Sequence, residues 1–276
     1  MKIIRAALLV GLRIAARFRW IRWVVAYTLQ GRPPLLRAEE CAALMVTRTE
    51  ADLLECLRAY GYTEGLKLSA EACATLVAYA QGSTFRGNQP GVVATPAEFR
   101  KYPEVFLFRR FDPHEDCALV DAIARDSRLT KLVWEYLGAH PILHSSQIWY
   151  SLPLPPSRSA IANPEYGFHY DIDDFRFLKV FFYLSNVDDR SGPHVAIGGS
   201  HADFSWRKKI ARRLSDAKAG TAGATAKVFH GLAGTGFVED TNLYHKGTKP
   251  EEPRLVLQIE YSLTPWFRDL ERRVSL

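Results

Sequence analysis

The sequence predicts a mainly β protein whose first part is helical. Helix formers and apolar residues at helical intervals fill residues 38–60, 69–81 and 116–138. After about residue 140, short runs rich in Ile, Val, Phe and Tyr are separated by turns, as expected for strands. The run 177–184 (FLKVFFYL) is almost continuously apolar, which is typical of a central strand covered on both faces. This order predicts helices followed by a double-layered β domain.

Capping residues place the ends of several of these helices. Thr49 followed by Asp52 and Ser69 followed by Ala72 are candidate helix starts, and the first also carries an acidic third position. Gly138 is expected to end the helical stretch over 116–138, because glycine readily adopts the left-handed conformation found after helices.

Two segments are predicted to be irregular. Residues 82–100 are rich in Gly, Pro and Asn, which predicts a loop. A polar, basic insertion near 202–230 is predicted to be a surface loop or lid. We therefore expect a helical N-terminal region over 1–100 that packs on a β domain over 101–276. The expected strands lie near 144–152, 166–172, 177–184, 193–197, 236–240, 242–247 and 254–262.

The composition is that of an ordinary globular protein, and its charge is unevenly placed. Among the 276 residues 47% are hydrophobic and 24% are charged, which excludes a disordered, collagen-like or coiled-coil chain. The net charge is +6, but eight cations precede the first acidic residue, Glu39, and the remainder of the chain carries −2. The positive charge thus belongs to the N-terminal segment, so we expect no nucleic-acid partner.

The basic N-terminal segment allows two interpretations. A helical apolar stripe is formed by Ile3, Ala7, Val10, Ile14, Phe18 and Ile21, with arginines beside and opposite it. One interpretation is a surface helix that packs on its own domain. The other is peripheral contact of residues 1–30 with an anionic membrane surface. Neither a secretory signal nor a transit peptide matches the segment, because Arg13 interrupts the apolar run and the first serine is Ser69.

The four cysteines are expected to be free thiols. Cys41, Cys56, Cys73 and Cys117 lie far apart and form no C-x-x-C motif, so neither a disulfide framework nor a zinc ribbon is predicted. Buried free thiols indicate a reducing compartment, and we expect a cytoplasmic protein, with membrane association left open by the N-terminal segment.

A histidine and a carboxylate are placed together by strand alternation. His169 and Asp171 share one face of the predicted strand 166–172. An H-x-D pair also occurs on ordinary solvated strands, but His245 supplies a second imidazole 76 residues later. Two histidines and one carboxylate form the facial triad that holds Fe(II) in non-haem oxygenases and leaves positions open for co-substrate and O₂.

An arginine opens the last predicted strand. In RLVLQIEY, Arg254 and Gln258 share one face, whereas Leu255 and Leu257 share the other. A guanidinium on the polar face could bind the distal carboxylate of a dicarboxylate chelated to iron, since its fork matches a carboxylate. A surface contact at a strand start is the alternative.

The motifs from residue 168 to 264 resemble those of the phytanoyl-CoA dioxygenase-like family. The H-x-D, the SGP turn, the GSH that ends the next strand, the distal histidine and the following arginine occur in the family's order. The resemblance covers about residues 140–264. It implies a double-stranded β-helix, a jelly-roll of the cupin type buttressed by α-helices, and the chemistry of Fe(II)- and 2-oxoglutarate-dependent oxygenases.

The resemblance also implies the residues of the site. His169, Asp171 and His245 would be the iron ligands, and Arg254 would anchor 2-oxoglutarate. Asp171 favours hydroxylation over halogenation, because related halogenases lack this carboxylate. O₂ would be the second co-substrate, and a small-molecule or lipid-like substrate would be hydroxylated with release of succinate and CO₂.

Other residues of this half are assigned less specifically. Gln147 is a candidate to line the co-substrate pocket, with core packing as its alternative. Lys179 could contact 2-oxoglutarate or substrate, and the alternative is that its side chain snorkels out of the sheet. His201 of the GSH turn is expected to be structural. The segment GLAGTG lacks the Lys-Ser/Thr of a phosphate loop, and no G-x-S-x-G occurs, so neither nucleotide binding nor serine hydrolysis is predicted. A non-catalytic membrane-surface or ligand-binding protein on the same fold remains the alternative function.

Overall fold

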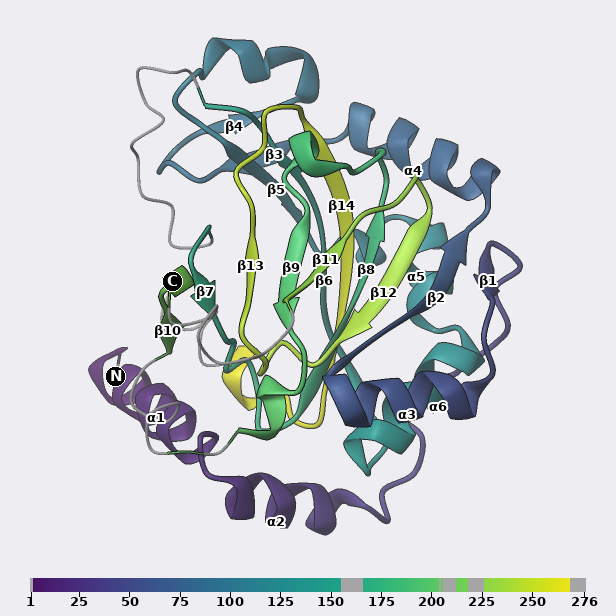
Figure 1. Ribbon diagram of the computed structural model, residues 1–276, viewed down its shortest axis with the longest axis vertical. Coiled ribbons are helices and arrows are strands. Elements are labelled where there is room, and N and C mark those ends of the chain that lie inside the picture. Colours follow the sequence, from purple (N-terminus) through teal and green to yellow (C-terminus); the bar gives the residue numbers. More distant parts are fainter. Residues whose placement is uncertain (1, 155–165, 204, 206–211, 218–225, 269–276) are drawn as a thin grey trace.

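Two antiparallel sheets form the centre of the protein, seen in a computed structural model (Figure 1). The structure describes residues 2–154, 166–203, 205, 212–217 and 226–268. The larger sheet has nine strands in the order β1-β2-β12-β8-β14-β6-β5-β3-β4, and the smaller has five in the order β10-β7-β13-β9-β11. This is the mainly β, jelly-roll architecture that the sequence predicts.

The strands of the larger sheet are β1 (Leu44–Val46), β2 (Tyr62–Leu68), β3 (Phe85–Gly87), β4 (Val93–Ala94), β5 (Leu107–Phe111), β6 (Ile142–Ser151), β8 (Phe177–Tyr183), β12 (Thr235–Glu239) and β14 (Arg254–Ser262). Those of the smaller sheet are β7 (Phe168–His169), β9 (His194–Ile197), β10 (Arg213–Leu214), β11 (Ala226–Phe229) and β13 (His245–Gly247). The α-helices are α1 (Lys2–Ala15), α2 (Arg19–Leu29), α3 (Glu50–Tyr60), α4 (Ala70–Gly82), α5 (Ala118–Ala124) and α6 (Ser127–Leu137).

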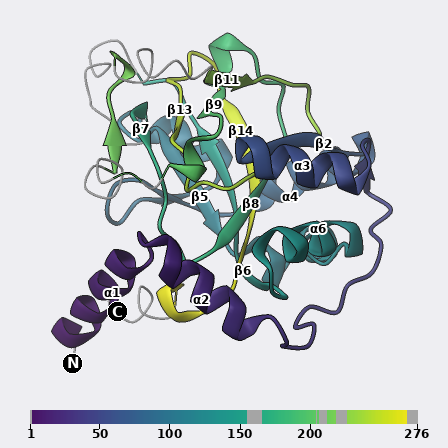
Figure 2. The same cartoon turned by 60° about the horizontal axis from the view of Figure 1, so that its bottom comes forward.

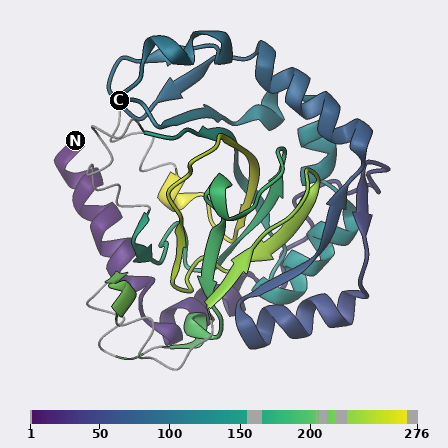
Figure 3. The same ribbon diagram turned by 45° about the horizontal axis from the view of Figure 1, so that its top comes forward.

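Helices cover one face of the larger sheet, and the smaller sheet faces the other. Residues of α3 to α6 pack with Ile148, Val180 and Leu257 in the main apolar core, and these helices lie around the outside of the strands (Figure 3). On the opposite face Phe181 and Phe237 pack with Ala196 of the smaller sheet. Strand alternation thus divides each central strand into a core side and a side that faces the other sheet.

The central strand is the one that the sequence indicates. All seven residues of β8 are buried, and β8 pairs with β12 on one side and with β14 on the other. In β14, Leu255 and Leu257 enter the main core, whereas Arg254 and Gln258 line a cavity between the sheets. The predicted division of this strand into two faces is confirmed.

The helix caps agree with the sequence, but two predicted helices are shorter than expected. The Thr49 hydroxyl accepts a hydrogen bond from Asp52 N, and the Ser69 hydroxyl accepts one from Ala72 N. The predicted helix over 38–60 is wrong in its first half, because Leu44–Val46 pairs as a strand with β2. The stretch over 116–138 is two helices, since the buried Asp126 caps α6 by accepting from the amides of Arg128 and Leu129.

Strands in the first half of the chain complete the larger sheet. The prediction of a loop over 82–100 is wrong in part, because β3 and β4 pair within it, and β2 pairs with β12. The sheet therefore includes strands from both sides of residue 100. That residues 1–100 form a region of their own stays a prediction. About half of the predicted insertion near 202–230 lies outside the described residues. In its described part the prediction of a loop is wrong, because β10 pairs with β7 and β11 pairs with β9.

The basic N-terminal segment forms two helices rather than one. The chain turns between α1 and α2, which follow one another along one edge of the molecule (Figure 2). The predicted stripe packs on the domain only in part. Ile21 packs against the buried cluster that includes Leu9 and Ala16, whereas Val10 and Ile14 are about half exposed. Within the described residues, no helix is long and apolar enough to cross a bilayer.

Asp174 joins the segment after β7 to the end of β14. Its carboxylate is 1% exposed and accepts hydrogen bonds from Leu263 N at 2.8 Å, Thr264 N at 2.7 Å and Thr264 Oγ1 at 2.6 Å. Asp174 lies three residues after Asp171, so these bonds fix the segment that carries Asp171 to the end of β14. Burial raises the pKa of Asp174 to about 6 despite these donors.

We expect Asp174→Ala to lower the free energy of unfolding by about 2–4 kcal/mol, because buried amide and hydroxyl donors lose their acceptor. Chemical denaturation followed by circular dichroism measures this change. Asp189→Ala is the control, since the Asp189 side chain is 91% exposed and its loss should change stability by less than about 0.5 kcal/mol. Equal stability of the two variants would contradict the assignment of Asp174 as a structural link.

Candidate metal centre

Two imidazoles meet because of the register of the smaller sheet. β13 pairs with β7 so that His245 stands directly opposite His169, although 76 residues separate them. On its other side His245 is opposite Ala196 of β9, whose methyl group leaves room for the imidazole. The two imidazole centroids lie 4.5 Å apart. Residues directly opposite on antiparallel strands point to the same face, so both rings enter the space between the sheets.

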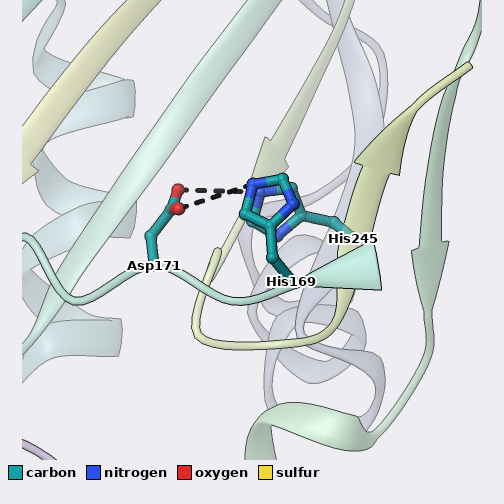
Figure 4. Close-up of side chains that lie close together, drawn as sticks. All are labelled: His169, Asp171 and His245. Atoms are coloured by element: carbon teal, nitrogen blue, oxygen red, sulfur yellow. Dashed lines mark ion pairs between the residues drawn. The ribbon is translucent and has the colours of Figure 1, made fainter. Parts of the chain in front are cut away.

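The Asp171 carboxylate completes a cluster of three (Figure 4). Asp171 Oδ1 is 3.8 Å from His169 Nε2, and Asp171 Oδ2 is 3.6 Å from His245 Nε2. One ligand atom from each residue lies within 4.8 Å of the others. β7 ends at His169, so the predicted strand over 166–172 is too long. The Asp171 side chain still points inward, with its backbone N–H bonded to Thr241 O at 2.8 Å.

Backbone carbonyls orient both imidazoles in the same way. His169 Nδ1 lies 2.9 Å from Gly167 O, and His245 Nδ1 lies 3.1 Å from Leu243 O. A carbonyl oxygen only accepts, so each Nδ1 carries the proton and each Nε2 presents a lone pair toward Asp171. Hydrogen bonds of this kind fix the tautomer and orientation of metal-binding histidines.

Electrostatics keep the cluster in the protonation states that a cation needs. Burial lowers the pKa of His245 to about 4, so its imidazole is neutral at neutral pH. Burial alone would raise the pKa of Asp171, but the charge of the nearby Lys179 ammonium outweighs it and holds that pKa well below its ordinary value. Two imidazoles and one carboxylate are the ligand set of a divalent transition metal, and of non-haem iron in particular.

Lys179 neutralises two carboxylates beside the cluster. Its ammonium lies 2.7 Å from Asp171 Oδ2 and 2.6 Å from Asp173 Oδ2. The side chain comes from the inner face of β8 and is 9% exposed, so the alternative that it snorkels out of the sheet is wrong. The ammonium also lies over the Phe177 ring, 5.7 Å from its centroid. Contact of Lys179 with 2-oxoglutarate stays a prediction.

The triad opens onto a large cavity between the sheets. The cavity has a volume of about 1240 Å³, and its lining includes His169, Asp171, His245, Lys179, Gln147, Trp149 and Arg254. Arg254 is buried at the start of β14 and donates from Nη1 to Gly192 O. All six residues predicted for the site thus line one cavity, and their individual roles stay predictions.

The remaining histidines lie outside the cluster. His194 stands beside His245, with Nε2 2.6 Å from Glu239 Oε2. His144 contacts Ser262, His201 Nε2 lies 3.3 Å from Arg58 O, and His230 pairs with Asp189 at the surface. The contact of His201 with the Arg58 carbonyl agrees with the structural role expected for this residue.

Two buried acids in the cavity region were not predicted. Glu239 is fully buried beneath the imidazoles, and burial raises its pKa to about 7. Glu260 accepts from the Ser145 hydroxyl, and burial raises its pKa to about 8, so it is mostly protonated at neutral pH. Each of these acids is directly opposite Lys179 on a neighbouring strand, so all three side chains point toward the space between the sheets. The sequence signal that could have identified them is an acidic residue within an otherwise apolar strand.

Comparison with solved structures identifies the fold. The chain matches the non-heme alpha ketoglutarate dependent epimerase SnoN from nogalamycin biosynthesis with a TM-score of 0.56 and 15% identity, over 77% of this chain and 82% of that one. It matches EctD from S. alaskensis with bound Fe at 0.53 and 18%, over 83% and 81%. It matches EvdO2 from Micromonospora carbonacea var. aurantiaca complexed with 2-oxoglutarate at 0.55 and 15%, over 78% and 91%.

The chain has the fold of iron- and 2-oxoglutarate-dependent oxygenases. This confirms the architecture that the resemblance to the phytanoyl-CoA dioxygenase-like family implies. No protein-family model and no curated protein sequence matches the chain. The fold therefore comes from the structural comparison, and the chemistry of this chain must be argued from its own residues.

We expect Lys179→Met to destabilise the metal-free protein by about 3–5 kcal/mol, because Asp171 and Asp173 lose their buried counter-ion. A divalent cation at the triad would restore much of the lost charge balance. Saturating Co²⁺ should therefore raise the thermal midpoint of the variant more than that of the unsubstituted protein, as measured by differential scanning calorimetry.

Lys131→Met is the matched control, since Lys131 pairs with Glu50 on the surface and its side chain is 53% exposed. Its thermal midpoint and its response to Co²⁺ should stay close to those of the unsubstituted protein. An unchanged metal-free stability in Lys179→Met would contradict the assignment of Lys179 as the counter-ion of these carboxylates.

Proposed function

We propose that the protein is an Fe(II)- and 2-oxoglutarate-dependent oxygenase that hydroxylates a small molecule. The observation that carries this proposal is the convergence of His169, Asp171 and His245 at one wall of the large cavity. When bound there, iron with 2-oxoglutarate and O₂ supplies the oxidation of the substrate, with release of succinate and CO₂.

In this proposal the three ligands hold the metal from one side and leave the cavity side to co-substrate and O₂. The backbone bonds to His169 Nδ1 and His245 Nδ1 keep both Nε2 atoms directed at the metal position.

Arg254 is proposed to anchor the distal carboxylate of 2-oxoglutarate. Arg254 is 7% exposed and lines the cavity, and its guanidinium donates to the main chain at Gly192, which holds the side chain in place. A buried, preoriented guanidinium is suited to a carboxylate, and the charge of a dianionic co-substrate would offset its desolvation. Gln147, at the centre of β6, is proposed to line the same co-substrate pocket.

Hydroxylation is the reaction that we favour. Asp171 occupies the ligand position at which halogenases of this type would need room for chloride. One of the structural neighbours is described as an epimerase, so the fold by itself does not select the reaction. The substrate is proposed to be a small organic molecule, since aromatic and polar side chains, such as Trp149 and Gln258, share the cavity wall.

A membrane-surface or ligand-binding protein without turnover is the second candidate function. The complete triad and the buried Arg254 favour catalysis over it. Contact of residues 1–30 with a membrane is compatible with turnover. The four cysteines are all free, which supports the proposal of a reducing, cytoplasmic compartment.

Anaerobic addition of Fe(II) and 2-oxoglutarate is expected to give a visible metal-to-ligand charge-transfer band, measured by absorption spectroscopy. The band should be lost in His169→Ala, because one of the three ligands is removed. His230→Ala is the control, since that imidazole lies at the surface beside Asp189. A folded protein that gives no band would remove the main support for the oxygenase proposal.

Arg254→Met is expected to weaken 2-oxoglutarate binding by about 10²-fold, the cost of a lost charge-assisted pair of about 3 kcal/mol. Titration of the same band with 2-oxoglutarate measures the affinity. Arg254→Lys should recover part of it, because the charge is kept and the bidentate fork is lost. Unchanged affinity in Arg254→Met would show that another group anchors the co-substrate.

A further inference from the structure

The outer surface of α1 and α2 is unusually apolar for a surface. Of the 17 large hydrophobic side chains that are exposed among the described residues, eight lie between residues 4 and 27. We call these eight side chains the outer face: Ile4, Leu8, Val10, Ile14, Trp20, Trp23, Val24 and Tyr27. Exposed apolar side chains concentrated in this way mark an interaction surface rather than random exposure.

On α2 the outer face is a continuous aromatic stripe. Trp20, Trp23, Val24 and Tyr27 follow the spacing of one helix face, and the Trp23 and Tyr27 rings stack with centroids 5.2 Å apart. Trp20 and Trp23 are 66% and 62% exposed. Tryptophan and tyrosine are the residues that favour the boundary between water and lipid, because each joins a large ring to a polar group.

A buried arginine prevents this stripe from turning inward. Arg22, on the opposite side of α2, is 8% exposed and donates from Nε to Phe175 O at 2.5 Å and from Nη1 to Asn242 Oδ1 at 2.8 Å. α1 is held likewise, since Leu9 and Ala16 pack with Phe175 in a buried cluster. The inner sides of both helices are thus committed to the domain, and the outer face is left to solvent.

The charge of this segment indicates which partner the outer face fits. Residues 1–38 carry eight cations and no acidic side chain. Arg22 among them is buried, but a second copy of this chain would still bring its own basic segment to the interface, and like charges disfavour such a pairing. A surface rich in anionic lipid complements both the charge and the aromatic stripe.

We propose that the outer face of α1 and α2 binds peripherally to the surface of a membrane that contains anionic phospholipid. The helices would lie along the interface with their aromatic side chains at the level of the headgroups. This inference is separate from the proposed oxygenase activity, and it extends the sequence-based expectation by naming the residues and the lipid chemistry.

The anchor of α2 also links this surface to the metal-binding loops. Asn242, which accepts from Arg22, donates from Nδ2 to Asp171 O at 3.4 Å and lies three residues before His245. A membrane bound to the outer face would therefore hold the domain in one orientation, through the loops that carry two of the three proposed metal ligands.

Sedimentation of the full chain with lipid vesicles tests the proposal. We expect binding to vesicles of phosphatidylcholine mixed with phosphatidylglycerol, with at least about tenfold weaker binding to phosphatidylcholine alone and weakening by added salt. Trp20→Ser/Trp23→Ser should reduce binding to the mixed vesicles by about tenfold or more, because the interfacial aromatic rings are lost. The assay needs neither iron nor 2-oxoglutarate, so its outcome is independent of the proposed activity.

Ile4→Ser/Leu8→Ser on α1 is a second variant at exposed positions, expected to weaken binding in the same direction. Leu232→Ser is the control, because that side chain is 69% exposed in the turn between β11 and β12. Circular dichroism checks that each variant is folded. Absent binding of the unsubstituted chain, equal binding to both kinds of vesicle, or unchanged binding in both folded double variants would overturn the proposal. So would a dimer in light scattering that the double substitutions dissociate, which would assign the outer face to a second copy.

Discussion

The pairing of β13 with β7 is the constraint on which the candidate site depends. This pairing sets His245 opposite His169, and the pairing of β13 with β9 supports it from the other side. Because side chains alternate along a strand, a slip of one residue would turn His245 away from the cavity. β7 and β13 are short, so much of the register must come from their surroundings, including the bond from Asp171 N to Thr241 O.

A lysine of the larger sheet offsets the cost of burying the carboxylates of the candidate site. Lys179 stands among Asp171 and Asp173, and the protonated form of Glu260 is favoured by burial beside them. An uncompensated buried charge would cost several kcal/mol, so these groups must neutralise one another in the metal-free protein. A bound divalent cation would add positive charge next to Lys179, which Asp173 and a dianionic co-substrate could balance. The metal site and the co-substrate site are therefore coupled electrostatically in this account.

The sequence predicted the second half of the fold better than the first. β8 and β14 were recognised because their apolar faces leave a pattern that is local and strong. β2 was missed because YTEGLKL mixes polar and apolar residues without a clear alternation, and it is stabilised by its neighbours β1 and β12 rather than by its own pattern. The predicted helix over 38–60 was too long for a related reason. The apolar residues around Leu44–Val46 are spaced as in a helix, but this segment pairs with β2 in the folded chain.

The candidate site was predictable where strand alternation or a motif decides it. His169 and Asp171 were paired by the two-residue period of a strand, although β7 ends at His169 and Asp171 is directed inward by the segment that follows it. His245 and Arg254 were placed by the order of the motifs. The pairing of Lys179 with Asp171 depends on the long-range packing of β8 against the segment after β7, which no local pattern reveals. The split of the N-terminal segment into two helices, with Arg22 buried, likewise depends on partners more than 150 residues away.

The central claim is that His169, Asp171 and His245 hold one iron ion together. A crystal structure of the protein grown anaerobically with Fe(II), with anomalous diffraction recorded at the iron edge, tests it most directly. The account predicts a single strong peak within bonding distance of both Nε2 atoms and one Asp171 oxygen, open toward Arg254 and the cavity. A peak bound elsewhere, or one that leaves either imidazole unbound, would contradict it.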